Sequence, residues 1–490
     1  MTDEEKTKIK NIIKDLKKNP VFNMSLSGKE IFHSNVLAWL LSETDNNKNP
    51  TQTSENLSKI FCPKRSDNNN VENQNYKVLT VLREKNNFDL LIVYYLREEN
   101  DDNNEETTQI KEKIITLIED NENRSQFEED FEKIKKDKLE NFLKNCRFVI
   151  IENKFKAIPD DSQLDRYYLS IPNWKLKRNS WEDSGNIKLV NISTQNGEKI
   201  DLSLKEENTT FYLLAPQKAL NLFVSDKNFY TNSSEYTYTH QRNKKKVDDK
   251  KTIDIKWYFI SYEDYLKNIK TIEQNEFILN HYKNFTNTMI KLADDIIDIK
   301  KTTPFYAFEE PIKFLKTIRI HDFYEKLWFT AANHMIKTVL DKDPNTKNIE
   351  THISYSNGMG MLNYKYTFAQ ENLKKARYGI EIQGKQFRIF VHTANTKEDK
   401  WKSAIEKNLK KEKERNIYPE IFDWLYKIYK DLDFSDKKEE NELDLGRFDE
   451  FKYLKFNLDP TTTVDKLTEM VSITIQNMRR QQDNFFAKLE

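Results

Sequence analysis

The chain has 490 residues, 37% hydrophobic and 33% charged, and its 80 basic residues balance 80 acidic ones. At roughly 150 residues per domain, this length predicts two to four domains, and 30 Phe, 23 Tyr and 7 Trp are enough to fill large cores. The zero net charge argues against a protein whose main activity is tight non-specific binding of DNA, because such proteins are usually basic. The chain has only 8 glycines and neither GxGxxG nor GxxxxGK[ST], so we expect no glycine-rich nucleotide site.

Two cysteines, Cys62 and Cys146, form neither a CxxC motif nor a zinc-binding pattern, which suits a reducing compartment. The N-terminal stretch MTDEEKTKIKN lacks the apolar core of a signal peptide. No run of about 18 apolar residues is present, so we expect no membrane contact. These features together predict a cytoplasmic protein.

The first part of the chain reads as a mixed α/β sheet. Apolar residues at helical spacing predict a helix over 4–18 and a largely buried one from Ser27 to Leu41, followed by an Asn-rich stretch over 43–76 with a short helix near its middle. Residues 97–145 are strongly charged and read as a helical insertion. Strands joined by short turns, then a strand–helix–strand crossover, predict a mixed sheet. The expected strands are 77–84, 88–96, 146–153, 211–215 and 257–260, with helices at 163–169 and 262–269.

The pattern changes near residue 275, where we place a domain boundary within about a dozen residues. The expected domains are therefore 1–275, with the insertion 97–145, and 276–490. The second domain reads as α+β, with a role in regulation, substrate binding or oligomerisation left open. Its expected helices are 277–299, 309–340, 400–413, 417–432 and a final one carrying the apolar stripe from Val464 to Phe485, and its expected strands are 352–368 and 377–392.

Two strands carry the residues that point to chemistry. Side chains alternate along a strand, so Glu152 and Lys154, at the end of the apolar run FVIIENK, project to the same face. Burying both is costly unless something balances them, and a divalent metal with a phosphate would do so. Asp89 lies at the start of the strand 88–96. If the two strands are neighbours, Asp89 and Glu152 lie at matching depth and offer the carboxylate pair that Mg²⁺ binds.

These residues resemble the core of the PD-(D/E)XK nuclease superfamily. Its pattern is an acidic residue on an early helix, an Asp at the start of the second strand and E-x-K on the third, here Glu30, Asp89 and Glu152-Asn153-Lys154. Three stretches are similar to one bacterial branch of the superfamily: EIFHSNVLAWLL around Glu30, QLDRYY from Gln163 and WYFISYEDYL from Trp257. The resemblance covers roughly residues 20–270 and implies a restriction-endonuclease-like fold.

The chain departs from the family pattern at two points. Phe88 stands where the family name has proline, and 62 residues separate Asp89 from Glu152. We ascribe this long gap to the insertion at 97–145, which would project from the end of the sheet. If the insertion belonged to the core, Asp89 and Glu152 would not pair.

The resemblance implies metal-dependent hydrolysis of a phosphodiester in nucleic acid, with DNA favoured over RNA. Asp89, Glu152 and the backbone carbonyl of Asn153 would bind Mg²⁺ or Mn²⁺, and Lys154 would position or deprotonate the attacking water. Glu30 would act beside the metal or bind a second one. Gln163 and Tyr167, one helical turn apart, would touch the site or the nucleic-acid backbone. Some related nucleases act in bacterial defence against phage.

Several of these residues have a second interpretation. The E-x-K motif could be a surface ion pair, and Ser27-Gly28-Lys29-Glu30 is also a helix capping box. Glu84 could be an acidic residue of the site or a surface charge at a hairpin end. His33 could be a hydrogen-bonded core histidine or a residue of a second layer around the site. The C-terminal stripe suits plain core or a dimer helix. The whole chain could be a catalytically silent nuclease-fold protein that binds nucleic acid or a protein, or a nuclease held inactive until a partner engages its C-terminal half.

Overall fold

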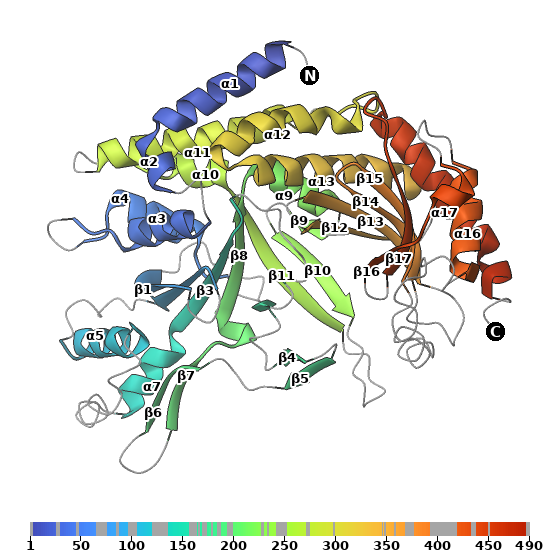
Figure 1. Ribbon diagram of the computed structural model, residues 1–490. Coiled ribbons are helices and arrows are strands. Elements are labelled where there is room, and N and C mark those ends of the chain that lie inside the picture. The colour runs from blue at the N-terminus through green and yellow to red at the C-terminus, as the bar shows by residue number, and fades with distance from the viewer. Residues whose placement is uncertain are drawn as a thin grey trace, which may run out of the picture. The chain divides into compact units, whose positions relative to one another are not determined.

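The computed structural model of the chain divides into two compact units, Asp15–Ile290 and Met1–Lys14 with Lys291–Glu490 (Figure 1). The division lies after the boundary expected near 275, and the N-terminal segment groups with the second unit. The structure describes residues 3–25, 30–45, 49–64, 76–84, 88–96, 105–119, 136–155, 164, 167–168, 174–177, 180–183, 188–193, 199–226, 230–232, 235–241, 252–270, 275–296, 299–344, 346, 349–356, 359–367, 377–392, 419–432, 438–448 and 451–486.

A seven-stranded mixed sheet forms the centre of the unit Asp15–Ile290, in the order β1-β2-β3-β8-β11-β10-β9. Strands β1, β2 and β3 are mutually antiparallel, β3, β8 and β11 are parallel, and β10 and β9 return antiparallel. All side chains of β2 except the last are buried, as expected for a strand covered on both faces. The strands are β1 (Tyr76–Arg83), β2 (Leu90–Leu96), β3 (Cys146–Asn153), β8 (Thr209–Ala215), β9 (Tyr230–Asn232), β10 (Glu235–Gln241) and β11 (Thr252–Ser261).

Helices flank this sheet, and the mixed α/β architecture expected from the sequence is confirmed. The five expected strands are present, and β3 has the predicted bounds. Strands β9 and β10, helices α2 and α9 and two hairpins were missed, because elements of 3 to 10 residues are too short for a periodic pattern to stand out in the sequence. The helices are α2 (Pro20–Met24), α3 (Glu30–Ser42), α4 (Gln52–Ile60), α5 (Glu105–Glu119), α7 (Lys136–Lys144), α9 (Gln217–Asp226), α10 (Tyr262–Lys267) and most of α11 (Glu276–Ile296); the hairpins pair β4 (Trp174–Lys177) with β5 (Ser180–Asp183) and β6 (Lys188–Ser193) with β7 (Lys199–Ser203).

The other unit holds a six-stranded antiparallel sheet in the order β12-β13-β14-β15-β17-β16. Helices pack on one face, where the Tyr364 hydroxyl donates to Asn333 of α13 and the Tyr378 hydroxyl to Gln482 of α17. The elements are α12 (Glu309–Leu315), α13 (His321–Leu340), β12 (Glu350–Ser356), β13 (Met359–Thr367), β14 (Arg377–Gln383), β15 (Gln386–His392), α16 (Pro419–Lys430), β16 (Gly446–Phe448), β17 (Phe451–Asn457) and α17 (Val464–Phe486), while α1 (Asp3–Lys18) starts in this unit.

Several expectations for this unit need correction. The helix expected over 309–340 is broken after α12, where Arg319 adopts a left-handed backbone with φ of 59°. The expected strands 352–368 and 377–392 are each a hairpin, β12–β13 and β14–β15. The helix expected over 400–413 lies outside the described residues. Within the part of the chain that the structure describes, no helix is long and apolar enough to span a membrane.

Candidate active site

The pairing of β2 with β3 brings the two predicted metal ligands to the same end of the sheet. The antiparallel register ends at the pair Leu90 and Ile151, so Asp89, just before β2, and Glu152, just after that pair, occupy the next opposed positions. The backbone N–H of Asn153 donates to Asp89 Oδ2 over 2.7 Å.

The described helices of the insertion 97–145 do not project from the sheet as expected: Ile114 of α5 and Phe142 of α7 are buried, and the Phe142 ring stacks on Tyr95 of β2 at 4.4 Å between centroids. The expectation that such packing would prevent the pairing of Asp89 with Glu152 is therefore also wrong, because the two residues still meet.

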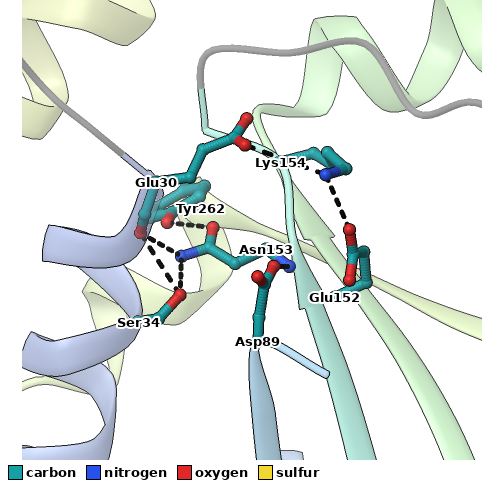
Figure 2. Close-up of polar contacts among 7 residues, drawn as sticks. All are labelled: Glu30, Ser34, Asp89, Glu152, Asn153, Lys154 and Tyr262. Carbon is teal, nitrogen blue, oxygen red and sulfur yellow. Dashed lines mark hydrogen bonds and ion pairs between the residues drawn. The ribbon is translucent and has the colours of Figure 1, made fainter. Parts of the chain in front are cut away.

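Glu152 and Lys154 lie on one face at the end of β3, as strand alternation predicts. Lys154 Nζ lies 2.6 Å from Glu152 Oε1 and 3.7 Å from Glu30 Oε2 (Figure 2). Glu152 is 1% exposed and Lys154 7%. The E-x-K motif is thus a buried ion pair with a third charged group beside it, and the alternative of a surface ion pair is wrong.

The site gathers the acidic side chains of Glu30, Asp89 and Glu152 around Lys154, and Glu152 and Asp89 are poorly solvated. Burial, with Asp89 as the second cause, raises the pKa of Glu152 to about 8, although the Lys154 ammonium opposes this shift. Burial also raises the pKa of Asp89 against the hydrogen bond from Asn153. For Lys154, burial lowers the pKa, but Glu30 and Glu152 outweigh it and the net shift is upward. Lys154 therefore stays an ammonium at neutral pH, whereas Glu152 in the metal-free protein holds a proton that a bound cation would displace.

Asn153 ties the end of β3 to two helices. Its Oδ1 accepts a hydrogen bond from the Tyr262 hydroxyl over 2.6 Å. Its Nδ2 donates to Ser34 Oγ over 3.1 Å and to the backbone carbonyl of Glu30 over 3.4 Å. Ser34 and Glu30 come from α3, and Tyr262 opens α10 directly after the capping residue Ser261, whose hydroxyl accepts from the Asp264 N–H. Asn153 therefore connects α3, α10 and β2 in one network (Figure 2).

Glu30 is the first residue of α3, and its side chain reaches the Lys154 ammonium while its carbonyl meets Asn153. Its capping partner, Ser27, lies outside the described residues. The structure thus places Glu30 at the predicted site, and Glu30 could also cap the helix as the sequence predicted.

The remaining predicted site residues fall in different places. His33 is 1% exposed, its Nδ1 lies 3.1 Å from the Tyr282 hydroxyl, and its ring is tilted by 37° against that of Phe155 with 3.8 Å between centroids. It belongs to the aromatic core behind Asn153 rather than to an exposed surface. The Gln163 prediction lies outside the described residues.

Two more predicted residues lie around Asp89. Glu84 has an exposed side chain and a left-handed backbone with φ of 51°, and its N–H donates to the Asp89 carbonyl over 3.3 Å. It occupies the hairpin end, which favours the interpretation as a surface charge. Tyr167 is half-buried, and its ring meets Phe88 edge-on at 5.5 Å. Tyr167 therefore supports the residue before Asp89, and contact with a nucleic acid stays a prediction.

The donor atoms at the strand ends fit a hard divalent cation. Among the described residues, no three His, Cys, Asp or Glu side chains form a group that would hold a metal by themselves. Mg²⁺ typically takes one or two carboxylates and completes its shell with waters and substrate phosphate, so Asp89 and Glu152 suffice as the protein's share. The backbone N–H of Lys154 donates to the Leu214 carbonyl of β8, whereas the backbone N–H of Asn153 points to the opposite side, toward β2. By alternation the Asn153 carbonyl also points to the β2 side, where Asp89 lies.

No family model, curated protein or solved structure matches the chain. The resemblance to the PD-(D/E)XK superfamily therefore remains an expectation from the sequence. Contacts among Asp89, Glu152, Lys154 and Glu30 supply the independent evidence on which a functional proposal can rest.

The sequence interpretation missed Ser34, Tyr262 and the side chain of Asn153. Ser34 lies one turn after Glu30 on an apolar helix, and Tyr262 follows the strand WYFIS directly. A polar residue inside an otherwise apolar buried helix was the available signal, because such a residue usually has a partner. Its partner could not be named, since Asn153 lies 119 residues further along the chain.

Proposed function

We propose that this protein is a metal-dependent nuclease, and that its unit Asp15–Ile290 has a restriction-endonuclease-like fold. The observation that carries the proposal is the meeting of Asp89 and Glu152 at the ends of two adjacent strands, with the Lys154 ammonium 2.6 Å from Glu152. Asp89 precedes the second strand of the sheet, Glu152 and Lys154 end the third, and Glu30 opens an early helix. This arrangement is the one that the sequence resemblance implies.

Asp89, Glu152 and the Asn153 carbonyl would hold Mg²⁺ or Mn²⁺. When bound, such a cation lowers the pKa of a coordinated water and stabilises the charge that develops on the phosphate. Lys154 keeps its proton at neutral pH, because its pKa is raised. It is therefore suited to donate hydrogen bonds to a phosphate oxygen or to the attacking water, and unsuited to deprotonate that water. Glu30, 3.7 Å from the ammonium, holds Lys154 from the other side.

The resemblance further suggests DNA rather than RNA as substrate, a cytoplasmic location and a setting in defence against phage. It gives no role to the second unit, for which binding of a protein regulator or self-association is our working hypothesis. A chain with no net charge should bind nucleic acid weakly on its own, which would suit a nuclease that is active only in a triggered state.

A cleavage assay on linear, circular and single-stranded DNA and on RNA, with Mg²⁺ or Mn²⁺ and with EDTA, tests the proposal. We expect metal-dependent cleavage by the wild type and its loss in Glu152→Ala and in Lys154→Ala. The chain offers a matched control in Lys205 and Glu207, the same two residue types at the same spacing, with 51% and 73% exposed side chains 3.8 Å apart. Lys205→Ala and Glu207→Ala should cleave like the wild type.

The assay also separates the proposal from its alternative. Cleavage that persists in Glu152→Ala and Lys154→Ala would remove these residues from the mechanism. Absence of cleavage on every substrate, together with nucleic-acid binding that the variants retain, would identify a catalytically silent binding protein.

A further inference from the structure

We infer that Asn153 and Tyr262 are positioning residues of the proposed metal site, acting together to hold Asp89 and Glu30 at the end of β3. The inference rests on the proposed function for the identity of the bound metal. It assigns a role to the backbone N–H and side-chain amide of Asn153 and to the Tyr262 hydroxyl, groups that touch neither the cation nor the substrate; the Asn153 carbonyl keeps its proposed part in binding the metal. Its basis is a hydrogen-bond network that runs through a single buried amide.

The two halves of Asn153 serve two different elements. Its backbone N–H donates to Asp89 Oδ2 over 2.7 Å, toward the β2 side of the strand. Its side chain lies on the opposite face of β3 from Glu152 and Lys154 and meets α3. One residue thus fixes the carboxylate of Asp89 and the helix start from which Glu30 reaches over the strand end to Lys154 (Figure 2).

Tyr262 sets the orientation of the Asn153 amide. An asparagine amide has one carbonyl acceptor and one NH₂ with two donors, and here Oδ1 meets the Tyr262 hydroxyl while Nδ2 meets Ser34 Oγ and the Glu30 carbonyl. If the amide turned over, Oδ1 would face the Glu30 carbonyl, and two acceptors would repel each other. The 2.6 Å bond from Tyr262 favours the observed orientation and so keeps the donors on α3.

The Tyr262 ring is held rigidly. It is fully buried and meets the ring of Phe155 edge-on at 4.7 Å, that of Tyr265 at 5.6 Å and that of His33 at 5.8 Å between centroids. A tyrosine locked in this way can fix the Asn153 amide with little loss of freedom. Groups bonded directly to metal ligands commonly contribute about 10- to 100-fold in metal affinity or activity. Tyr262 acts one bond further out, through Asn153, so we expect the lower end of this range.

Tyr262→Phe, made in the full-length chain, removes only the hydroxyl. Tyr212→Phe is the matched control, because the Tyr212 hydroxyl is also buried, lies in the same unit and donates to the Cys62 carbonyl over 2.8 Å, away from the network. Ser34→Ala is a second test from the other side of the amide, with a residue that favours the helix. For each protein we would titrate Mn²⁺ in the cleavage assay and measure amide hydrogen exchange of peptides covering β3 and the start of α3.

In Tyr262→Phe and Ser34→Ala we expect the Mn²⁺ concentration for half-maximal cleavage to rise about 10-fold, with the rate restored at saturating Mn²⁺ and the substrate KM unchanged. Exchange at the end of β3 and the start of α3 should quicken, whereas Tyr212→Phe should match the wild type in both readouts. An unchanged Mn²⁺ requirement in Tyr262→Phe, beside a wild type that cleaves, would overturn the positioning role alone. A wild type without metal-dependent cleavage would instead remove the proposed function and the metal-positioning role with it, whatever the exchange data show.

Discussion

The carboxylate of Asp89 accepts a hydrogen bond from the backbone N–H of Asn153, with 2.7 Å between Oδ2 and the nitrogen. The bond continues the β2–β3 ladder one step beyond the pair Leu90 and Ile151, with a side-chain oxygen in place of a main-chain carbonyl. The backbone of one strand thereby holds the carboxylate of its neighbour. Because Glu152 adjoins Asn153 in sequence, the same bond keeps the two carboxylates together.

Lys154→Met should destabilise the metal-free protein. Methionine keeps an unbranched side chain but leaves Glu152 buried without the ammonium that lies 2.6 Å away. Removing one partner of a buried ion pair typically costs about 3 kcal/mol or more. We expect a loss of this size in the free energy of unfolding, measured by urea denaturation at pH 9 in EDTA. At pH 6 the loss should be smaller, because Glu152 can then be protonated.

The control for this variant is Lys205→Met, which breaks the exposed pair with Glu207. Exposed pairs contribute less than about 1 kcal/mol, so its unfolding midpoint should stay close to that of the wild type at both pH values. Equal losses in the two variants would mean that the Lys154 pair has no special stabilising role.

The pKa of Glu152 predicts how the stability of the metal-free protein changes with pH. This pKa is raised from 4.5 to about 8, mainly by burial and then by Asp89. Between these values the folded state binds a proton that the unfolded state has lost, so the free energy of unfolding should fall as pH rises from about 4.5 to about 8. Urea denaturation across this range in EDTA measures the slope, and Glu152→Gln should flatten it.

Binding of Mg²⁺ should release a proton at pH 7. A cation requires the ionised carboxylate, so the apparent affinity should rise with pH up to about 8 and then level off. Titration calorimetry in two buffers of different ionisation enthalpy measures the released proton. Heats that do not depend on the buffer, in a wild type that binds the metal, would contradict the raised pKa of Glu152.

The strand bearing the E-x-K motif could be predicted because its information is local. The apolar run 148–151 predicted strand β3, and alternation predicted that Glu152 and Lys154 share a face. The network around Asn153 could not be predicted in the same way. Tyr262 lies 109 residues from Asn153, and only the tertiary fold brings a residue so distant to one particular amide.

Turns within the second unit were the weakest part of the sequence interpretation. Apolar spacing continues from α12 into α13, and neither glycine nor proline marks the left-handed residue Arg319. Between β12 and β13 the sequence contains Asn357-Gly358, a frequent hairpin turn, which was an available signal. Gly384 between β14 and β15 was another.

Gly384→Ala should destabilise the second unit by about 1 kcal/mol, because φ at this position is +54° and a Cβ is disfavoured in the left-handed region. The added Cβ would also lie 3.0 Å from the Met359 sulfur, at the end of a flexible side chain that can move. Gly384→Asn is the control, since asparagine tolerates this conformation better than alanine. The midpoint of thermal unfolding should be highest for the wild type, lower for Gly384→Asn and lowest for Gly384→Ala. The reverse order of the two variants would show that backbone strain at this position does not set their stability.

Glu30→Gln separates the two roles of Glu30. Glutamine can still take the third position of a capping box, so α3 should keep its stability, but the charge that lies 3.7 Å from the Lys154 ammonium is lost. If Glu30 belongs to the site, metal-dependent cleavage should fall about 10-fold with little change in the unfolding midpoint. Glu30→Ala would add the loss of the cap, about 1 kcal/mol by analogy with other capping residues. Should Glu30→Gln cleave like the wild type while Glu30→Ala is less stable, Glu30 would serve only to begin the helix.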